Sequence, residues 1–189
     1  MSSKRNKFKC RQRGFSLLEL MVTVAVLAIV TGVAAPSFRS MQMRSRLTAA
    51  ANELNAVLQT ARMEAVKSNG RVELCPSSNG SSCDGNDWKR LIVVAKKGNV
   101  ETVLQEVSLN GKGIEISASS NIGNGNKIWY QADGLVRVGG NAGSAHHQGV
   151  LSVCIKELSG ENARYVQMHM GRISTARRAS GNCGAPTNF

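Results

Sequence analysis

The feature that most restricts the fold of this chain is a long apolar run near the N-terminus. Residues 15–36 contain a single charged residue, Glu19. As a helix, these 22 residues extend about 33 Å and can cross the roughly 30 Å hydrocarbon core of a bilayer. A carboxylate in that core costs at least about 2.5 kcal/mol unless a partner neutralises its charge. Glu19 is therefore predicted to be a functional residue with a cationic partner.

The segment before the apolar run is strongly basic. Residues 1–14 contain six Lys and Arg side chains and no acid, in a chain whose net charge is +12. The positive-inside rule places such a segment in the cytoplasm. A secretory signal peptide would have an apolar region of about 7–15 residues, followed by a cleavage site of small residues. Here the apolar run is longer, and the conspicuous small residue, Gly14, precedes it.

The cysteines indicate that the remainder of the chain is exported. There are five, and Cys10 lies in the basic leader, so four remain if the leader is removed. An even set in an exported domain predicts two disulfides. Cys75 and Cys83 close a short loop, and Cys154 and Cys183 then pair by elimination. A zinc site is the alternative, but the sequence has no C-x-x-C and no spaced His pair, so we expect no metal and no cofactor.

Beyond Pro36 the sequence keeps a helical period and becomes amphipathic. Apolar residues recur at three- and four-residue steps from Leu47 to Ala65, with polar and charged residues between them. Asn69-Gly70 supplies a helix stop. One helix is therefore expected from Phe15 to Ser68, with its outer half lying against the rest of the protein.

From Arg71 the period changes to that of strands. The predicted strands are Arg71–Cys75, Trp88–Ala95, Val100–Val107, Gly113–Ser119, Lys127–Gln131, Leu135–Val138, Val150–Glu157 and Arg164–Met170. Clusters of Gly, Asn and Ser separate them. Short strands with tight connections favour antiparallel pairing. The expected fold class is α+β, a long helix packed on an antiparallel β-sandwich head.

The junction before the apolar run resembles that of a known family. Arg13-Gly14-Phe15-Ser16-Leu17-Leu18-Glu19, after a basic leader, resembles the class III leader of type IV pilins and of the pseudopilins of type II secretion. The resemblance implies that a prepilin peptidase cuts between Gly14 and Phe15 and that Phe15 is N-methylated. It also implies that Glu19 acts in filament assembly, paired with the new amino terminus of its own or a neighbouring Phe15.

A second region is similar to a narrower group. The Cys75–Cys83 loop, followed by Trp88 and an apolar strand, is similar to the GspH/FimT minor pilins and pseudopilins, which include FimU-like proteins. The resemblance implies a cleaved leader at residues 1–14, a transmembrane helix at 15–36, its amphipathic continuation at 37–69 and a β-rich head at 70–189. It implies a single pass through the inner membrane, a periplasmic head and later incorporation in a pilus among major and minor pilins.

The C-terminal region is basic. FimT-like proteins carry a Gly-Arg-x-Arg motif implicated in DNA uptake, and this chain has Gly171-Arg172-Ile173-Ser174, with Ser in place of the second Arg. Arg177 and Arg178 could compensate, together with Arg164. We expect a flexible, acid-free segment whose arginines contact DNA phosphates without reading bases. The alternative is a tail that keeps the head soluble or pairs with a neighbouring subunit.

No combination of residues in the sequence is typical of an enzyme. His146-His147 lies in a Gly-rich stretch without spaced carboxylates or cysteines, which favours a solvated loop over a metal site. Neither a P-loop nor a G-x-S-x-G motif is present. The sequence therefore predicts a minor type IV pilin that acts in pilus assembly and binds DNA for natural transformation. A pseudopilin of type II secretion is the alternative.

Overall fold

The computed structural model describes residues 14–140 and 145–188 of the chain. The chain forms two compact units, residues 1–39 and residues 40–189. The predicted leader lies outside the described residues except for Gly14. Helix α1 (Leu17–Ser68) begins in the first unit and ends in the second. The single long helix predicted from Phe15 to Ser68 is confirmed to within two residues.

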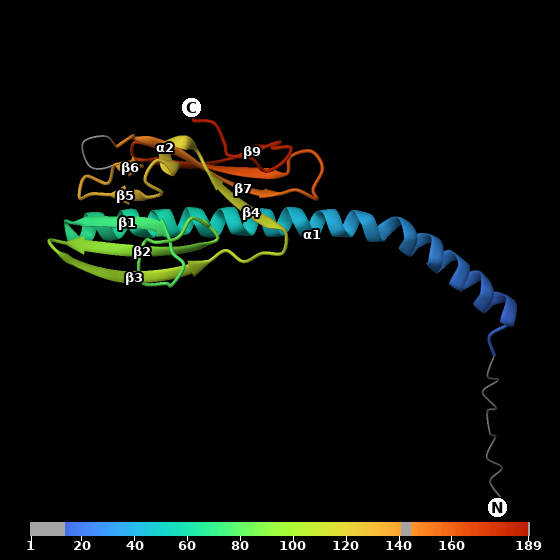
Figure 1. The fold of residues 1–189 in the computed structure, drawn as a ribbon. Coiled ribbons are helices and arrows are strands. Elements are labelled where there is room, and N and C mark those ends of the chain that lie inside the picture. The colour runs from blue at the N-terminus through green and yellow to red at the C-terminus, as the bar shows by residue number, and fades with distance from the viewer. Residues whose placement is uncertain (1–13, 141–144, 189) are drawn as a thin grey trace, which may run out of the picture. The chain divides into compact units, whose positions relative to one another are not determined.

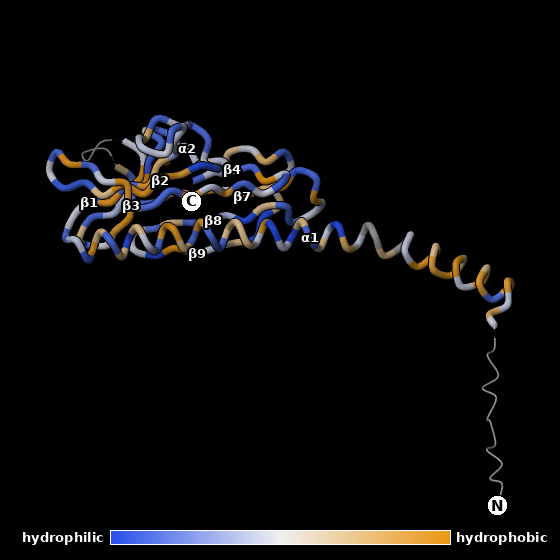
Figure 2. Tube along the Cα trace, turned by 90° about the horizontal axis from the view of Figure 1, so that it is seen from below, coloured by the Kyte–Doolittle hydropathy of each residue, from blue (hydrophilic) through white to orange (hydrophobic). Residues whose placement is uncertain are grey.

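In the first unit, α1 is apolar on all sides. Its large side chains are exposed, among them Leu17, Leu27 and Ile29. Hydrophobic residues predominate along this part of the helix (Figure 2). Among the residues that the structure describes, α1 is the one helix long and apolar enough to cross a membrane, judged by length and composition. A helix that is hydrophobic all round is stable only in an apolar environment.

In the second unit, α1 buries one stripe of small and medium apolar side chains. The buried residues are Leu47, Ala50, Ala51, Leu54, Val57, Leu58, Ala61 and Ala65. Their spacing of three and four residues places them on one face. The helix ends with the amide of Gly70 donating to the carbonyl of Ala65 and that of Asn69 donating to Val66. This is a Schellman motif in which Asn69, at φ 49°, takes the left-handed position.

The rest of the second unit consists of two antiparallel sheets (Figure 1). The first has the order β3-β2-β1-β5-β6, and the second has the order β4-β7-β8-β9. The strands of the first sheet are β1 (Arg71–Pro76), β2 (Arg90–Lys97), β3 (Val100–Ser108), β5 (Ile128–Tyr130) and β6 (Val136–Val138). Those of the second are β4 (Ile114–Ala118), β7 (Gln148–Ile155), β8 (Ala163–His169) and β9 (Arg172–Arg178). A one-turn helix, α2 (Ser120–Gly123), follows β4.

One hydrophobic core joins the helix to both sheets. It includes Leu54 and Leu58 from α1, Leu74 from the first sheet, and Leu151 and Val166 from the second. Figure 1 shows the C-terminal half of α1 running along both sheets. Each sheet has one face against this core, so the helix and both sheets stabilise one another. The predicted α+β fold is therefore confirmed.

The C-terminal region differs from the prediction of a flexible segment. Arg172–Arg178 forms strand β9, which pairs with β8 along its whole length. The residues after it are tied down by the Cys154–Cys183 disulfide and by hydrogen bonds from Asn162 to Ser180 and from Asn188 to Ser120. The prediction was wrong because β9 is an edge strand with little apolar alternation, so its sequence does not indicate a strand. Its backbone hydrogen bonds are supplied by β8.

Candidate functional site

The start of α1 carries the residues of the predicted processing site. Gly14 and Phe15 lie in non-helical, exposed backbone just before α1 begins at Leu17. Glu19 lies in the first turn of the helix and is exposed. A carboxylate in the first turn interacts favourably with the positive end of the helix dipole. The first unit therefore presents an accessible chain segment, then one acid, then an apolar helix.

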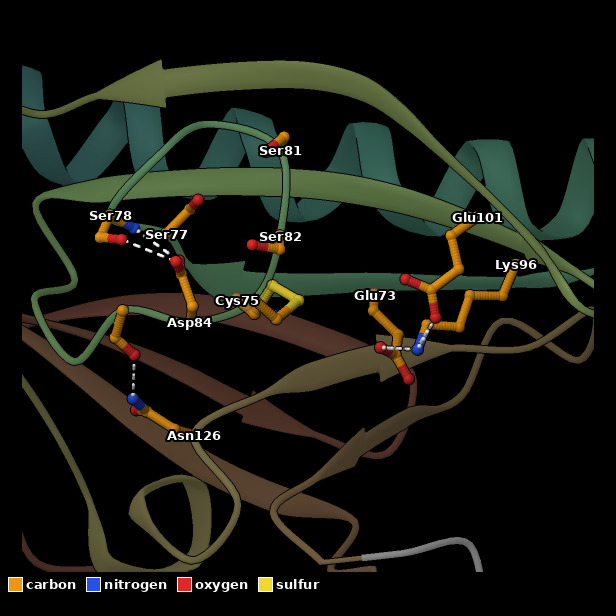
Figure 3. The surroundings of a disulfide bond; sticks show 12 residues. Glu73, Cys75, Ser77, Ser78, Ser81, Ser82, Asp84, Lys96, Glu101 and Asn126 are labelled. Atoms are coloured by element: carbon orange, nitrogen blue, oxygen red, sulfur yellow. Dashed lines mark hydrogen bonds and ion pairs between the residues drawn. A yellow bond between two sulfur atoms is a disulfide. The ribbon is translucent and has the colours of Figure 1, made fainter.

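The Cys75–Cys83 loop is a rigid part of the head. The two cysteines are bonded, and the Asn79 side-chain oxygen accepts from the amides of Ser81 and Ser82 at 2.7 and 2.9 Å. Asp84 accepts from the amide and hydroxyl of Ser78 at 2.8 and 2.7 Å, as Figure 3 shows. These two bonds lower the pKa of the Asp84 carboxyl. Asn79, Gly80 and Ser81 thus form a turn inside the loop, which the Asn79 side chain stabilises by these hydrogen bonds.

Further contacts fix this loop and the segment that follows it to the sheets. The Trp88 indole donates to the Asn126 side chain at 2.9 Å, and the Asn126 amide donates to the carbonyl of Gly85 at 2.9 Å. Arg90, at the start of β2, pairs with Glu106 at 2.6 Å and also donates to the carbonyl of Ser78. Arg90 thus holds the loop and Asn126 holds the segment after it, which favours a structural role.

Sequence reasoning missed an ion cluster around a buried carboxylate of the first sheet. Glu73 of β1 is buried and pairs with Arg71 and, at 2.9 Å, with Lys96, which also pairs with Glu101 at 2.7 Å (Figure 3). The Arg71 guanidinium lies 4.5 Å from the centre of the Trp129 ring. Glu73 stands between two buried residues in an apolar strand, the one signal that could have indicated it. Arg71 is on the same strand, two residues before Glu73, but Lys96 comes from β2 and Glu101 from β3, so the sequence alone could not name these two.

The structure separates the four predicted DNA-binding arginines into two sets. Arg164 and Arg177 are directly opposite in the β8–β9 register and face α1, as do the core residues Val166 and Met168 of β8. Arg172 and Arg178 are even-numbered residues of β9 and therefore lie on the other face of the sheet. Arg172 is opposite His169.

Arg44 of α1 joins the first set, although sequence reasoning did not single it out. A groove of about 550 Å³ lies between α1 and strands β8 and β9. Its lining residues are Met41, Arg44, Ser45, Thr48, Ala49, Asn52, Arg164 and Arg177. We call this feature the arginine groove. Arg44 is 120 positions before Arg164 in the sequence, and only the fold brings them together.

Arg164 is the deepest of the three arginines, with 6% of its surface exposed. Its Nη1 donates to the carbonyls of Ala163 and Glu161 at 3.0 and 3.4 Å. Burial, and then the positive charge of Arg177, lowers the pKa of Arg164; Arg44 adds to this effect, while Glu161 opposes it. Arg44 Nη2 donates to the carbonyl of Ser159 at 3.3 Å. The ion pairs seen among the described residues are formed by other side chains than these three arginines.

Gly171, the first residue of the partial Gly-Arg-x-Arg motif, has a structural role. It lies in the tight turn between β8 and β9, and its carbonyl accepts a hydrogen bond from Arg62 of α1 at 2.5 Å. A Cβ added at Gly171 would lie 3.3 Å from the Arg62 guanidinium. The turn is thereby attached to the helix, which positions β9 and its arginines.

The His146-His147 pair is part of the sheet framework. His146 forms a bridge with Val138, and the His147 ring nitrogen lies 3.1 Å from the carbonyl of Val136. Within residues 14–140 and 145–188, no three His, Cys, Asp or Glu side chains are grouped in a way that could hold a metal ion.

A long helix whose N-terminal part is apolar with one acid, and whose C-terminal part packs against two antiparallel sheets, defines a pilin-like fold. The family model described as "Type II transport protein GspH" matches residues 50–171, and that described as "Prokaryotic N-terminal methylation motif" matches residues 9–35. The chain belongs to the GspH family of type IV pilin-like proteins, as the resemblance indicated.

The chain is also similar to curated proteins that include a type IV pilin, and a solved structure of a minor pilin has the same fold. Prepilin peptidase-dependent protein D of Escherichia coli (strain K12) is 30% identical over 131 residues, which cover 63% of this chain and 81% of that protein. Type IV major pilin protein PilA of Myxococcus xanthus (strain DK1622) is 40% identical over 52 residues, 28% of this chain and 24% of PilA. The chain thus spans about a quarter of the length of PilA. The crystal structure of the Pseudomonas aeruginosa (strain PAO1) minor pilin FimU shares the fold, with a TM-score of 0.54 and 22% identity over 75% of this chain and 97% of FimU.

Proposed function

We propose that this protein is a minor pilin that enters a type IV pilus through the apolar part of α1. The observation that carries the proposal is the arrangement at the start of α1. A single carboxylate, Glu19, lies in an exposed apolar helix, four residues after Phe15. Prepilin peptidase would cut between Gly14 and Phe15 while the helix spans the inner membrane with the head in the periplasm. Phe15 would then be N-methylated.

Cleavage supplies the cation that Glu19 requires. The new amino terminus at Phe15 is four residues before Glu19, a separation of about one turn once the helix extends to the new terminus. In lipid or in a filament core, Glu19 would pair with this amine in its own or a neighbouring subunit, since an unpaired buried charge costs several kcal/mol. The pairing would set the register of the subunit among other pilins. The role is structural, and we propose no catalysis.

The test replaces Glu19 with Val in cells that lack their own copy of the protein. We expect normal head folding and leader cleavage but at least a tenfold loss of the protein from sheared pili, measured by immunoblot. Glu53→Val is the matched control, because Glu53 is an exposed acid on the same helix in the second unit. Normal incorporation of Glu19→Val, or an equal loss for both variants, would refute the mechanism.

A pseudopilin of type II secretion is the alternative, because the matching family is described as a type II transport protein. Deleting the protein separates the two functions. A minor pilin would be needed for surface pili and not for secreted enzymes, and a pseudopilin would show the reverse. Both assays can be run on the same deletion strain.

DNA binding is a second candidate function, favoured by three arginines on β9. Arg172, Arg177 and Arg178 are exposed on an edge strand of the head. Residues 40–189 hold 17 Lys and Arg against 11 Asp and Glu, a net charge of +6. We leave Arg164 out of this proposal, because a side chain so deeply buried cannot reach the backbone of a duplex lying on the surface.

A gel shift with the full-length protein in nonionic detergent tests DNA binding. If three phosphates are neutralised, log K against log salt should fall with a slope of about −3. The variant Arg172→Ala/Arg177→Ala/Arg178→Ala should lose the shift. No shift at 50 mM salt, or equal binding by the variant, would end this candidate.

A further inference from the structure

We propose that the arginine groove binds the carboxylates of an acidic segment from a partner protein. The proposal goes beyond pilus assembly and DNA binding, and it stands on the second unit alone. The groove brings guanidinium groups from three elements together: Arg44 from α1, Arg164 from β8 and Arg177 from β9. An acidic side chain is absent from the lining of the groove, all of which lies in the described part of the chain.

The arrangement of the three arginines is unfavourable without an anion. Arg164 and Arg177 are directly opposite on neighbouring antiparallel strands and share a face. Like charges in this position destabilise a sheet. Arg44 approaches the same space from the helix. Glu161 is exposed, and Arg164 donates to its backbone carbonyl rather than to its carboxylate. An anion entering the groove would relieve the repulsion among the guanidinium groups.

The shape of the groove favours a carboxylate of a peptide over a nucleic acid. Arg164 is 6% exposed and can be reached only by a group that enters the groove. A duplex is too wide to enter a space of about 550 Å³ between a helix and a strand. A Glu or Asp side chain can enter, and the guanidinium fork matches its two oxygens. Met41, Thr48 and Ala49 offer apolar atoms to the aliphatic part of such a side chain.

Charge complementarity favours a different protein over a second copy of this chain. The unit from residue 40 to 189 carries a net charge of +6, so two copies repel each other. Its acids on the first sheet are already paired, Glu73 and Glu101 with Lys96 and Glu106 with Arg90. The occupant is therefore expected to be an acidic stretch of a partner.

The test measures binding of a fluorescein-labelled hexaglutamate peptide by fluorescence polarisation, with the full-length protein in nonionic detergent at 50 mM salt. The variant Arg44→Gln/Arg177→Gln removes the two more accessible arginines and leaves buried Arg164 in place. We expect Kd to rise tenfold or more, the effect of losing two charge-assisted hydrogen bonds.

Arg172→Gln/Arg178→Gln is the matched control, since it also removes two positive charges, both from the face of β9 opposite to Arg177. Its Kd should rise less than threefold. The single variant Arg177→Gln, at an exposed edge-strand position, should raise Kd at least threefold and covers the case in which the double variant does not fold. The proposal is overturned if the wild type does not bind, or if both double variants lose affinity equally. It is also overturned if the groove variant loses binding to a DNA duplex and keeps the peptide.

Discussion

Removing the Cys154–Cys183 disulfide should destabilise the head more than removing Cys75–Cys83. The two bonds close loops with sequence separations of 29 and 8 residues. The entropy of loop closure in the unfolded chain gives about 3.6 kcal/mol for the longer loop and about 2.5 kcal/mol for the shorter one. The expected difference is therefore about 1 kcal/mol.

The burial of the cysteines also predicts a larger loss of stability for the Cys154–Cys183 pair than for the Cys75–Cys83 pair. Cys154 is fully buried and Cys183 nearly so, in a cluster with Ala163 and Tyr165. Cys83 is exposed. Replacing Cys154 and Cys183 with Ala therefore also removes packing contacts on the outer face of the second sheet. The cysteine contacts with Asn162 and Ser180 disappear, while the bonds between those two residues remain.

The assay is urea unfolding of the full-length protein in nonionic detergent, followed by tryptophan fluorescence. Both tryptophans, Trp88 and Trp129, are buried in the head and report its unfolding. Cys154→Ala/Cys183→Ala should lose about 3.6 kcal/mol or somewhat more, and Cys75→Ala/Cys83→Ala about 2.5 kcal/mol. In thermal unfolding, the first pair should lower Tm by roughly 7–14 °C.

Three outcomes would refute this reasoning: no loss of stability, equal losses for the two pairs, or a larger loss for the short loop. Mass analysis of the mature wild type under non-reducing conditions supplies the control. Four cysteines should resist alkylation, and free thiols at Cys154 and Cys183 would remove the basis of the comparison.

Three further predictions concern the head. Leu54→Ala, at the centre of the core, should lower the free energy of unfolding by about 2–5 kcal/mol in the same urea assay; a loss below 1 kcal/mol would contradict the single core. Arg177→Gln should raise stability by up to about 1 kcal/mol, since it removes the repulsion with Arg164, and a loss would contradict that account. The hydrogen bonds from Arg137 and from the Leu135 amide lower the pKa of Asp133 from 3.8 to about 2. Its contribution to stability is thus present above about pH 4 and lost as the pH falls through 2, and Arg137→Gln should move the NMR titration midpoint of Asp133 upward.

Helices and strands in which apolar residues recur at a regular spacing could be predicted from the sequence. The stripe from Leu47 to Ala65 has the helical repeat, and the residues it indicates are those that the structure buries. The eight predicted strands occur with boundaries that differ by a few residues. Most of these elements have a core-facing side, so burial and periodicity carry the same information. Strand β3 is the exception, since Val107 is its one buried residue.

Features that depend on tertiary pairing could not be predicted. Strand β9 carries Ile173 as its one large apolar residue, and its backbone is satisfied by β8 rather than by a pattern of its own. Arg44 is a surface residue by its sequence context, and its meeting with Arg164 depends on how α1 lies on the second sheet. The buried Glu73 could be suspected from its apolar strand, but its partner Lys96 is set by the β1–β2 register.

The strand conformation of β9 changes what the basic C-terminal region can do. On a flexible segment, Arg177 and Arg178 would act as one cluster of charge. On a strand, neighbouring residues point to opposite faces. Arg177 therefore lines the groove beside α1, and Arg178 lies on the outer face of the sheet with Arg172. The single variants Arg177→Gln and Arg178→Gln carry the same charge change one position apart. If peptide binding depends on the first and not the second, the strand geometry, and not net charge, governs recognition.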